Sequence, residues 1–162
     1  MRFSLVIFYF TFFCSALQGQ PKYIPSFVSD TMSIQGTKQV VEGDYVECVL
    51  HDLSVVRFFK TNDHKYYVRF LVTQNFYFNK VAMLEIRSGS KSSHEKDVKQ
   101  FKVSKTSGMF LVEVYKNYFA TYKDSGITGI VFGEAETQFT KQDANQIKKM
   151  SSFFYDAITP KK

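Results

Sequence analysis

The residues of this chain that could do acid–base or nucleophilic chemistry are few and scattered. Its three histidines are His51, His64 and His94, and His51 is adjacent to Asp52. Nucleophilic catalysis needs a Ser or Cys within hydrogen-bond reach of a His that an acid orients. Adjacent residues on a strand point to opposite faces, and the other two histidines fall in predicted turns. We therefore expect no catalytic residues and no enzymatic activity.

Metal and cofactor sites are not indicated either. The three histidines and Cys48 lack the spacing of two to five residues that zinc ligands use. Gly126, Gly129 and Gly133 lie in a strand pattern rather than between a strand and a helix, so they indicate a turn and close strand packing, not a phosphate loop. We expect no metal and no cofactor.

The N-terminal segment predicts the location of the protein. Arg2 precedes a largely apolar run at residues 3–13, and small residues follow at 14–19. This is the layout of a secretory signal peptide. We expect residues 1–19 to be the signal peptide and residues 20–162 to form one secreted, extracellular domain. No later segment has the twenty or so consecutive apolar residues of a membrane span.

Charge and cysteine content limit the partners. The 21 Lys and Arg against 15 Asp and Glu give a formal net charge of +6. The basic residues are spread along the chain rather than clustered, so nucleic-acid binding is not expected. With Cys14 in the signal peptide, only Cys48 remains, which excludes an internal disulfide. Cys48 is either a small buried residue or an exposed thiol that joins two chains; we expect a monomer or a weak dimer.

Short apolar and aromatic runs separated by turn residues predict an antiparallel β-protein. The predicted strands are residues 40–50, 53–60, 65–73, 76–87, 98–103, 109–114, 118–122 and 127–133. The polar stretch 88–97 is interpreted as a link. Alternation around Arg69 turns Tyr66, Val68, Phe70 and Val72 inward, because burying an unpaired Arg is costly.

A single helix is expected at residues 143–158. Thr140 and Asp143 have the spacing of a capping box, and Pro160 lies just beyond the end. An apolar stripe formed by Ile147, Met150, Phe154, Ala157 and Ile158 predicts that the helix packs against the outside of the sheet.

Eight antiparallel strands in succession favour an all-β, up-and-down barrel, since closure removes exposed strand edges. An open two-layer sandwich is the alternative. An eight-stranded barrel has an interior that either holds one small ligand or is filled by its own side chains.

Three short segments add a family resemblance. They are Gly43-Asp44-Tyr45, Glu113-Val114-Tyr115-Lys116-Asn117-Tyr118 and Phe132-Gly133-Glu134. Their order, and the helix that follows, resemble the lipocalins, in particular the branch of odorant-, pheromone- and urinary-protein carriers. The structural signature positions are Gly43, Tyr45, Tyr115, Gly133 and Glu134.

The chain also departs from the lipocalin pattern. Tyr45 stands where the family has Trp, Glu134 stands where it has Arg, and the cysteines of a common disulfide are missing. Strict alternation places Tyr45 on the same face as Glu47, opposite the more apolar Val46 and Cys48. Tyr45 therefore faces the interior only if a bulge intervenes.

The resemblance implies a secreted carrier that binds a small hydrophobic ligand, such as an odorant, a pheromone or a lipid, inside the barrel. Strand parity predicts the lining as Val56, Phe58, Tyr66, Val68, Phe70, Leu84, Ile86, Phe101, Phe110, Val112, Phe119, Ile130 and Phe132. The alternative is a secreted interaction module with a filled barrel, which would bind a protein such as a cell-surface receptor.

Overall fold

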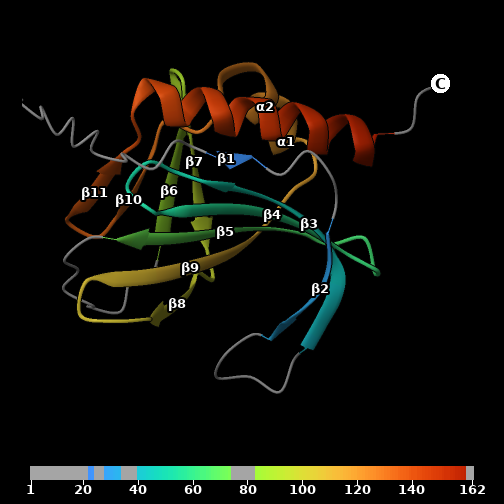
Figure 1. The fold of residues 1–162 in the computed structure, drawn as a ribbon, viewed down its shortest axis with the longest axis horizontal. Coiled ribbons are helices and arrows are strands. Elements are labelled where there is room, and N and C mark those ends of the chain that lie inside the picture. Colours follow the sequence, from blue (N-terminus) through green and yellow to red (C-terminus); the bar gives the residue numbers. More distant parts are fainter. Residues whose placement is uncertain (1–21, 24–27, 34–39, 74–82, 160–162) are drawn as a thin grey trace, which may run out of the picture.

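The computed structural model describes residues 22–23, 28–33, 40–73 and 83–159, which are mostly β-strand with two helices (Figure 1). One antiparallel sheet contains β1 (Lys22–Tyr23), β2 (Val28–Ser33), β3 (Val40–Val49), β4 (Val55–Thr61), β5 (Tyr66–Thr73), β8 (Lys99–Lys102) and β9 (Ser107–Val114). The other contains β6 (Met83–Ser88), β7 (Lys91–Lys96), β10 (Gly129–Phe132) and β11 (Ala135–Gln138). The helices are α1 (Tyr118–Ser125) and α2 (Lys141–Ile158). The predicted signal peptide lies outside the described residues.

The strand order is not that of an up-and-down barrel. The larger sheet runs β1-β3-β4-β5-β9-β8, with β2 also on β3, and the smaller sheet runs β11-β10-β6-β7. Because β5 pairs with β9 instead of β6, the β6–β7 hairpin joins a separate sheet whose strands run in a different direction (Figure 1). The described strands form two open sheets and no closed barrel.

The strongly alternating strands were predicted well. The predicted runs 40–50, 53–60, 65–73, 98–103, 109–114 and 127–133 correspond to β3, β4, β5, β8, β9 and β10. Of the predicted strand 76–87, residues 83–87 belong to β6, and the rest lies outside the described residues. The predicted helix 143–158 is α2.

The predicted strand 118–122 is wrong, because these residues form α1. Phe119 and Tyr122 are the buried residues of α1, three positions apart on one helical face. The helix ends at Gly126, which has a positive φ of 70° and whose N–H donates to the Tyr122 carbonyl. A short aromatic run alone does not distinguish a strand from a helix.

The prediction that residues 88–97 form a polar link is also wrong, because these residues contain strand β7. This strand pairs with β6 along its whole length, from Ser88 with Lys91 to Met83 with Lys96. It contains no apolar residue, so its sequence gives no hydrophobic alternation. Gly89, with a φ of 60°, forms the tight turn between the two strands.

The core lies between the two sheets and the helices. The predicted inward residues Val68, Phe70 and Val72 are buried in it. Helix α2 contributes Ile147, Met150, Phe154 and Ile158, whereas Ala157 of the predicted stripe is exposed. The helix is therefore part of the core and does not pack on the outside of the sheet.

The opposite face of the larger sheet carries a second cluster, formed by Phe59, Tyr67 and Leu111 with Tyr45 and Phe101 packed against them. The parity prediction for Tyr45 is confirmed, because it pairs with Phe59 in regular register and no bulge turns it inward. The guanidinium of Arg57 lies 3.6 Å from the centre of the Tyr45 ring, a cation–π contact.

The other signature positions fall in different surroundings. Gly43 packs so closely against β4 that a Cβ would lie 2.0 Å from the Lys60 carbonyl oxygen. Tyr115 is exposed after β9, and Gly133 and Glu134 form the turn between β10 and β11.

Candidate functional site

The predicted barrel-lining residues form the packed core. Those that are buried in it are Val56, Phe58, Val68, Phe70, Leu84, Ile86, Phe110, Val112, Phe119, Ile130 and Phe132. Tyr66 is half-buried and packs at the margin of this core. The inward placement of Phe101 is wrong: it pairs with Met109 and lies on the opposite face, because Gln100 is the β8 residue that pairs with the core residue Phe110.

Aromatic side chains fill the space between these residues. Phe58 and Phe119 have ring centres 5.0 Å apart, and Phe119 and Phe154 have centres 4.6 Å apart. At the other end of the core, the Phe110 and Phe132 centres are 4.4 Å apart. These are the contact distances of aromatic pairs in a packed interior.

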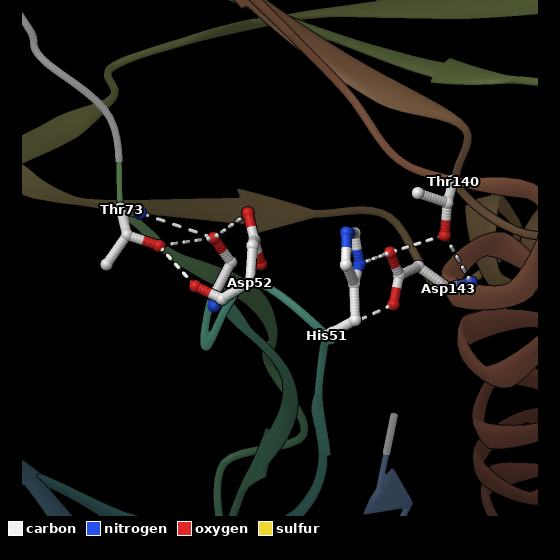
Figure 2. A network of polar contacts seen from close by, with 6 residues as sticks. His51, Asp52, Thr73, Thr140 and Asp143 are labelled. Atoms are coloured by element: carbon white, nitrogen blue, oxygen red, sulfur yellow. Dashed lines mark hydrogen bonds and ion pairs between the residues drawn. The ribbon is translucent and has the colours of Figure 1, made fainter. Parts of the chain in front are cut away.

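His51 and Asp143 form a polar contact between parts of the chain that are 92 residues apart (Figure 2). The Asp143 carboxylate, whose side chain is 1% exposed, accepts hydrogen bonds from the His51 backbone N–H at 3.1 Å and the Thr140 hydroxyl at 2.6 Å, and it also contacts His51 Nδ1. The Asp143 N–H in turn donates to Thr140 Oγ1 at 3.2 Å. The predicted N-cap of α2 is confirmed, and the Asp143 carboxylate also joins the start of α2 to the turn that follows β3.

A second polar group lies nearby, around Asp52 and Thr73 (Figure 2). The Asp52 carboxylate accepts hydrogen bonds from the backbone N–H and the hydroxyl of Ser54, both at 2.9 Å. The Ser54 hydroxyl also lies 3.2 Å from Thr73 Oγ1. Thus Asp143 contacts the His51 imidazole as an orienting acid would, but the hydroxyls of Ser54 and Thr73 are hydrogen-bonded to Asp52 and to each other.

Cys48 is a core residue, which confirms the buried interpretation. Its side chain is fully buried and forms no disulfide. Burial, together with the charges of Asp143 and Glu47, raises the pKa of the Cys48 thiol to about 12. Such a thiol stays protonated at neutral pH and is a poor nucleophile.

The inward face of β7 is polar, which is unusual for a strand that faces a core. Lys91, Ser93 and Glu95 pair with Ser88, Ile86 and Leu84 of β6, and residues paired across antiparallel strands share a face. All three β6 residues are buried. Ser93 and Glu95 of β7 therefore point towards the interior, where α1 lies opposite them, whereas Lys91 at the start of the strand is exposed.

A cavity of about 180 Å³ opens between β7 and α1. Its walls come from three elements: Ile86 and Ser88 of β6, Lys91 to Ser93 of β7, and Tyr118, Thr121 and Tyr122 of α1. A cavity of roughly 150 Å³ holds a benzene-sized molecule, so this one accommodates a single ring with a short chain. The cavity is partly open to solvent.

A second hollow, of about 480 Å³, adjoins the first at Tyr118. Its lining is more polar and includes Glu95, Lys99 and Glu113. Glu95 thus lies on its wall, whereas Ser93 and Tyr122 belong to the wall of the smaller cavity.

Three buried polar atoms at this boundary make no hydrogen bond with the described residues: Tyr122 Oη, Ser93 Oγ and Glu95 Oε1. Tyr122 is 2% exposed and Glu95 is 7% exposed. Buried polar groups are nearly always hydrogen-bonded, and leaving one without a partner costs roughly 1 to 3 kcal/mol. A ligand with polar groups would supply the missing partners.

The electrostatics show that these groups are close together. Burial raises the pKa of Glu95, against smaller opposing effects of the neighbouring Ser93 hydroxyl and of the His94 charge. Burial also raises the pKa values of Tyr122 and Tyr118, and in both cases the Glu95 charge acts in the same direction. Perturbed titratable groups beside a cavity are typical of functional sites.

The sequence contains a signal for this site that hydrophobic periodicity does not detect. Residues 91–96 read Lys-Ser-Ser-His-Glu-Lys, and an all-polar strand looks like a loop when only apolar residues are counted. The tyrosines at 115, 118 and 122 are a second signal for this site. On a helix, residues 118 and 122 share one face, which places two aromatic rings side by side.

Comparisons with known proteins do not identify this chain: no family model, no curated protein and no solved structure matches it. Within the described residues, no helix is both long and apolar enough to cross a membrane. The same residues contain no group of three or more His, Cys, Asp or Glu side chains arranged to hold a metal ion.

Proposed function

We propose that this protein is a secreted carrier of a small molecule, and that the ligand occupies the cavity between β7 and α1 instead of the interior between the sheets. The observation that carries this proposal is the cavity of about 180 Å³ bordered by the hydroxyls of Tyr122 and Ser93, which lack hydrogen-bond partners. Ligand pockets typically combine apolar walls with a few polar groups that fix orientation.

The two kinds of wall have different roles in this proposal. Ile86 and the rings of Tyr118 and Tyr122 provide apolar contact. Burial of apolar ligand surface contributes roughly 25 cal/mol per Å² before the costs of ordering. Because this cavity is smaller than the pockets that hold most drug-sized ligands, the proposed ligand has about one ring and a short chain.

Isothermal titration calorimetry of the folded protein tests the proposal. The probes are 2-phenylethanol, 2-phenylethylamine and 3-phenylpropionate, which share one ring and differ in charge. We expect saturable binding of at least one probe with a stoichiometry of one. If a demonstrably folded protein binds none of them, the carrier proposal is wrong.

A cavity-filling variant locates the binding. Ser93→Met places a longer side chain in the cavity and is expected to weaken binding at least tenfold. Lys105→Met, on an exposed turn away from the cavity, is the control and leaves the affinity unchanged. Circular dichroism establishes that both variants are folded; equal affinities would place the ligand elsewhere.

The packed core favours a second candidate, a secreted interaction module without a small ligand. Large exposed apolar side chains in the described residues are Leu53, Met83, Val103 and Tyr115. This candidate predicts that none of the probes binds and that replacing Tyr115 with Ser weakens the binding of a protein partner such as a cell-surface receptor.

A further inference from the structure

Glu95 is a buried carboxylate that lacks a cationic partner. It makes no ion pair of 4.0 Å or less with the described residues, and its Oε1 atom has no hydrogen-bond donor. His94, the adjacent residue on β7, points to the other face and lies 4.0 Å from Glu85. Buried acids are almost always paired, so an unpaired one beside a cavity points to a ligand that supplies the positive charge.

Aromatic rings surround the same place. Tyr115 and Tyr118 have ring centres 6.0 Å apart and nearly perpendicular planes, and Tyr118 and Tyr122 have centres 6.4 Å apart. The electron-rich faces of tyrosine rings attract cations such as the lysine ammonium group, and cages of such rings recognise quaternary and methylated ammonium ions. A carboxylate beside three tyrosines is therefore suited to an organic cation.

The polar atoms indicate which kind of cation. The three atoms without partners, Glu95 Oε1, Ser93 Oγ and Tyr122 Oη, can all accept hydrogen bonds. An ammonium group of the type R–NH₃⁺ carries three N–H donors. A quaternary ammonium has none and would leave these acceptors unsatisfied.

Building on the proposed carrier function, we propose that the ligand is a small primary amine, bound as its ammonium ion at Ser93, Glu95 and Tyr122 with its apolar part in the cavity beside Ile86 and Tyr118. Glu95 supplies the counter-charge at the boundary of the two hollows. Exposed Lys91 lies at the cavity wall, so an acidic ligand is the competing chemistry that the experiment must separate.

The test compares 2-phenylethylamine with three analogues of similar shape by calorimetry at pH 7.5. We expect it to bind more tightly than neutral 2-phenylethanol, anionic 3-phenylpropionate and N,N,N-trimethyl-2-phenylethylammonium. Equal or tighter binding of the alcohol or the carboxylate overturns the amine proposal while leaving the carrier function in place. Equal or tighter binding of the quaternary ion overturns the role of the three hydrogen-bond acceptors.

Variants assign the effect to residues. Losing one member of a buried charge pair costs about 2 kcal/mol or more, so Glu95→Gln is expected to weaken amine binding on the order of 30-fold. The same substitution should leave the affinity for 2-phenylethanol within about twofold, and Glu113→Gln, on the wall of the larger hollow, should change amine binding far less. Unchanged amine affinity in Glu95→Gln overturns the proposal, and a cooperative thermal transition for each variant shows that folding is not the cause.

Discussion

Replacing Glu95 with Gln is expected to stabilise the protein without ligand at neutral pH. The Glu95 side chain is 7% exposed, its Oε1 atom has no hydrogen-bond partner, and burial raises its pKa above the ordinary value of 4.5. Gln keeps the size of the side chain and cannot ionise. Because a buried unpaired charge is costly, removing it is expected to raise the stability by about 1 kcal/mol.

The pH dependence follows from the direction of the pKa shift. Below 4.5 the acid is protonated in both the folded and the unfolded chain, and its ionisation has no effect on stability. As the pH rises through 4.5 towards the higher pKa of the folded state, the unfolded chain loses its proton first, so wild-type stability falls. Above the folded pKa the loss is constant. Glu95 interacts electrostatically with His94 on β7 and with Tyr118 and Tyr122 on α1, and the two tyrosines stay neutral in this range.

Urea denaturation at pH 7.5 and pH 4.0 measures this effect. We expect Glu95→Gln to raise the free energy of unfolding by about 1 kcal/mol at pH 7.5, which corresponds to roughly 3 °C in Tm for a chain of this size, and by much less at pH 4.0. The control Glu134→Gln, in an exposed turn, should stay within about 0.5 kcal/mol of wild type. A loss of stability at pH 7.5, or a gain of equal size at both pH values, would refute the reasoning.

Three further predictions concern the scaffold. Asp143→Ala is expected to lower the free energy of unfolding by about 2 to 4 kcal/mol in urea denaturation, because it removes the carboxylate that joins α2 to His51. The control Asp156→Ala, at an exposed position, should lower it by under about 0.5 kcal/mol. Similar losses in the two variants would contradict a special role of Asp143. Gly126→Ala should lower the Tm clearly more than Gly133→Ala. Both glycines have a positive φ, but only at Gly126 would a Cβ lie 2.5 Å from a carbonyl oxygen. Equal losses in Tm would show that this contact relaxes freely. Cys48 should resist alkylation by iodoacetamide in the native protein at pH 8 and react in 8 M urea, because burial raises the pKa of its thiol to about 12. Free cysteine is the control. Rapid alkylation of the native protein would contradict the core position of Cys48.

The parts of the fold that the sequence predicts are those in which alternation and burial agree. Strand β5 alternates between core residues and Arg69, and α2 has a cap and an apolar stripe, so both could be identified locally. The pairing of β5 with β9 could not, because about 35 residues separate them along the chain and no local pattern encodes a partner at that distance. The barrel was expected because consecutive strands usually pair.

The candidate site was missed because it breaks the rules on which the prediction depends. Strand β7 has no apolar residues, so its sequence predicts a polar link. The short run of aromatic residues in α1 predicts a strand. The contact between His51 and Asp143, 92 residues apart, depends on tertiary structure alone. Polar residues at inward positions depart from the hydrophobic pattern expected of a strand, and such departures are expected at functional sites.

The position of α2 in the chain has a consequence for biosynthesis. Ile147, Met150 and Phe154 of this helix complete the same core as Val46 and Phe58, yet α2 follows all the described strands in the chain. During synthesis, the part of the core face of β3 and β4 that α2 covers therefore stays uncovered until α2 has left the ribosome or the translocation channel. Nascent chains that end before residue 140 would expose this apolar sheet face to chaperones and to one another.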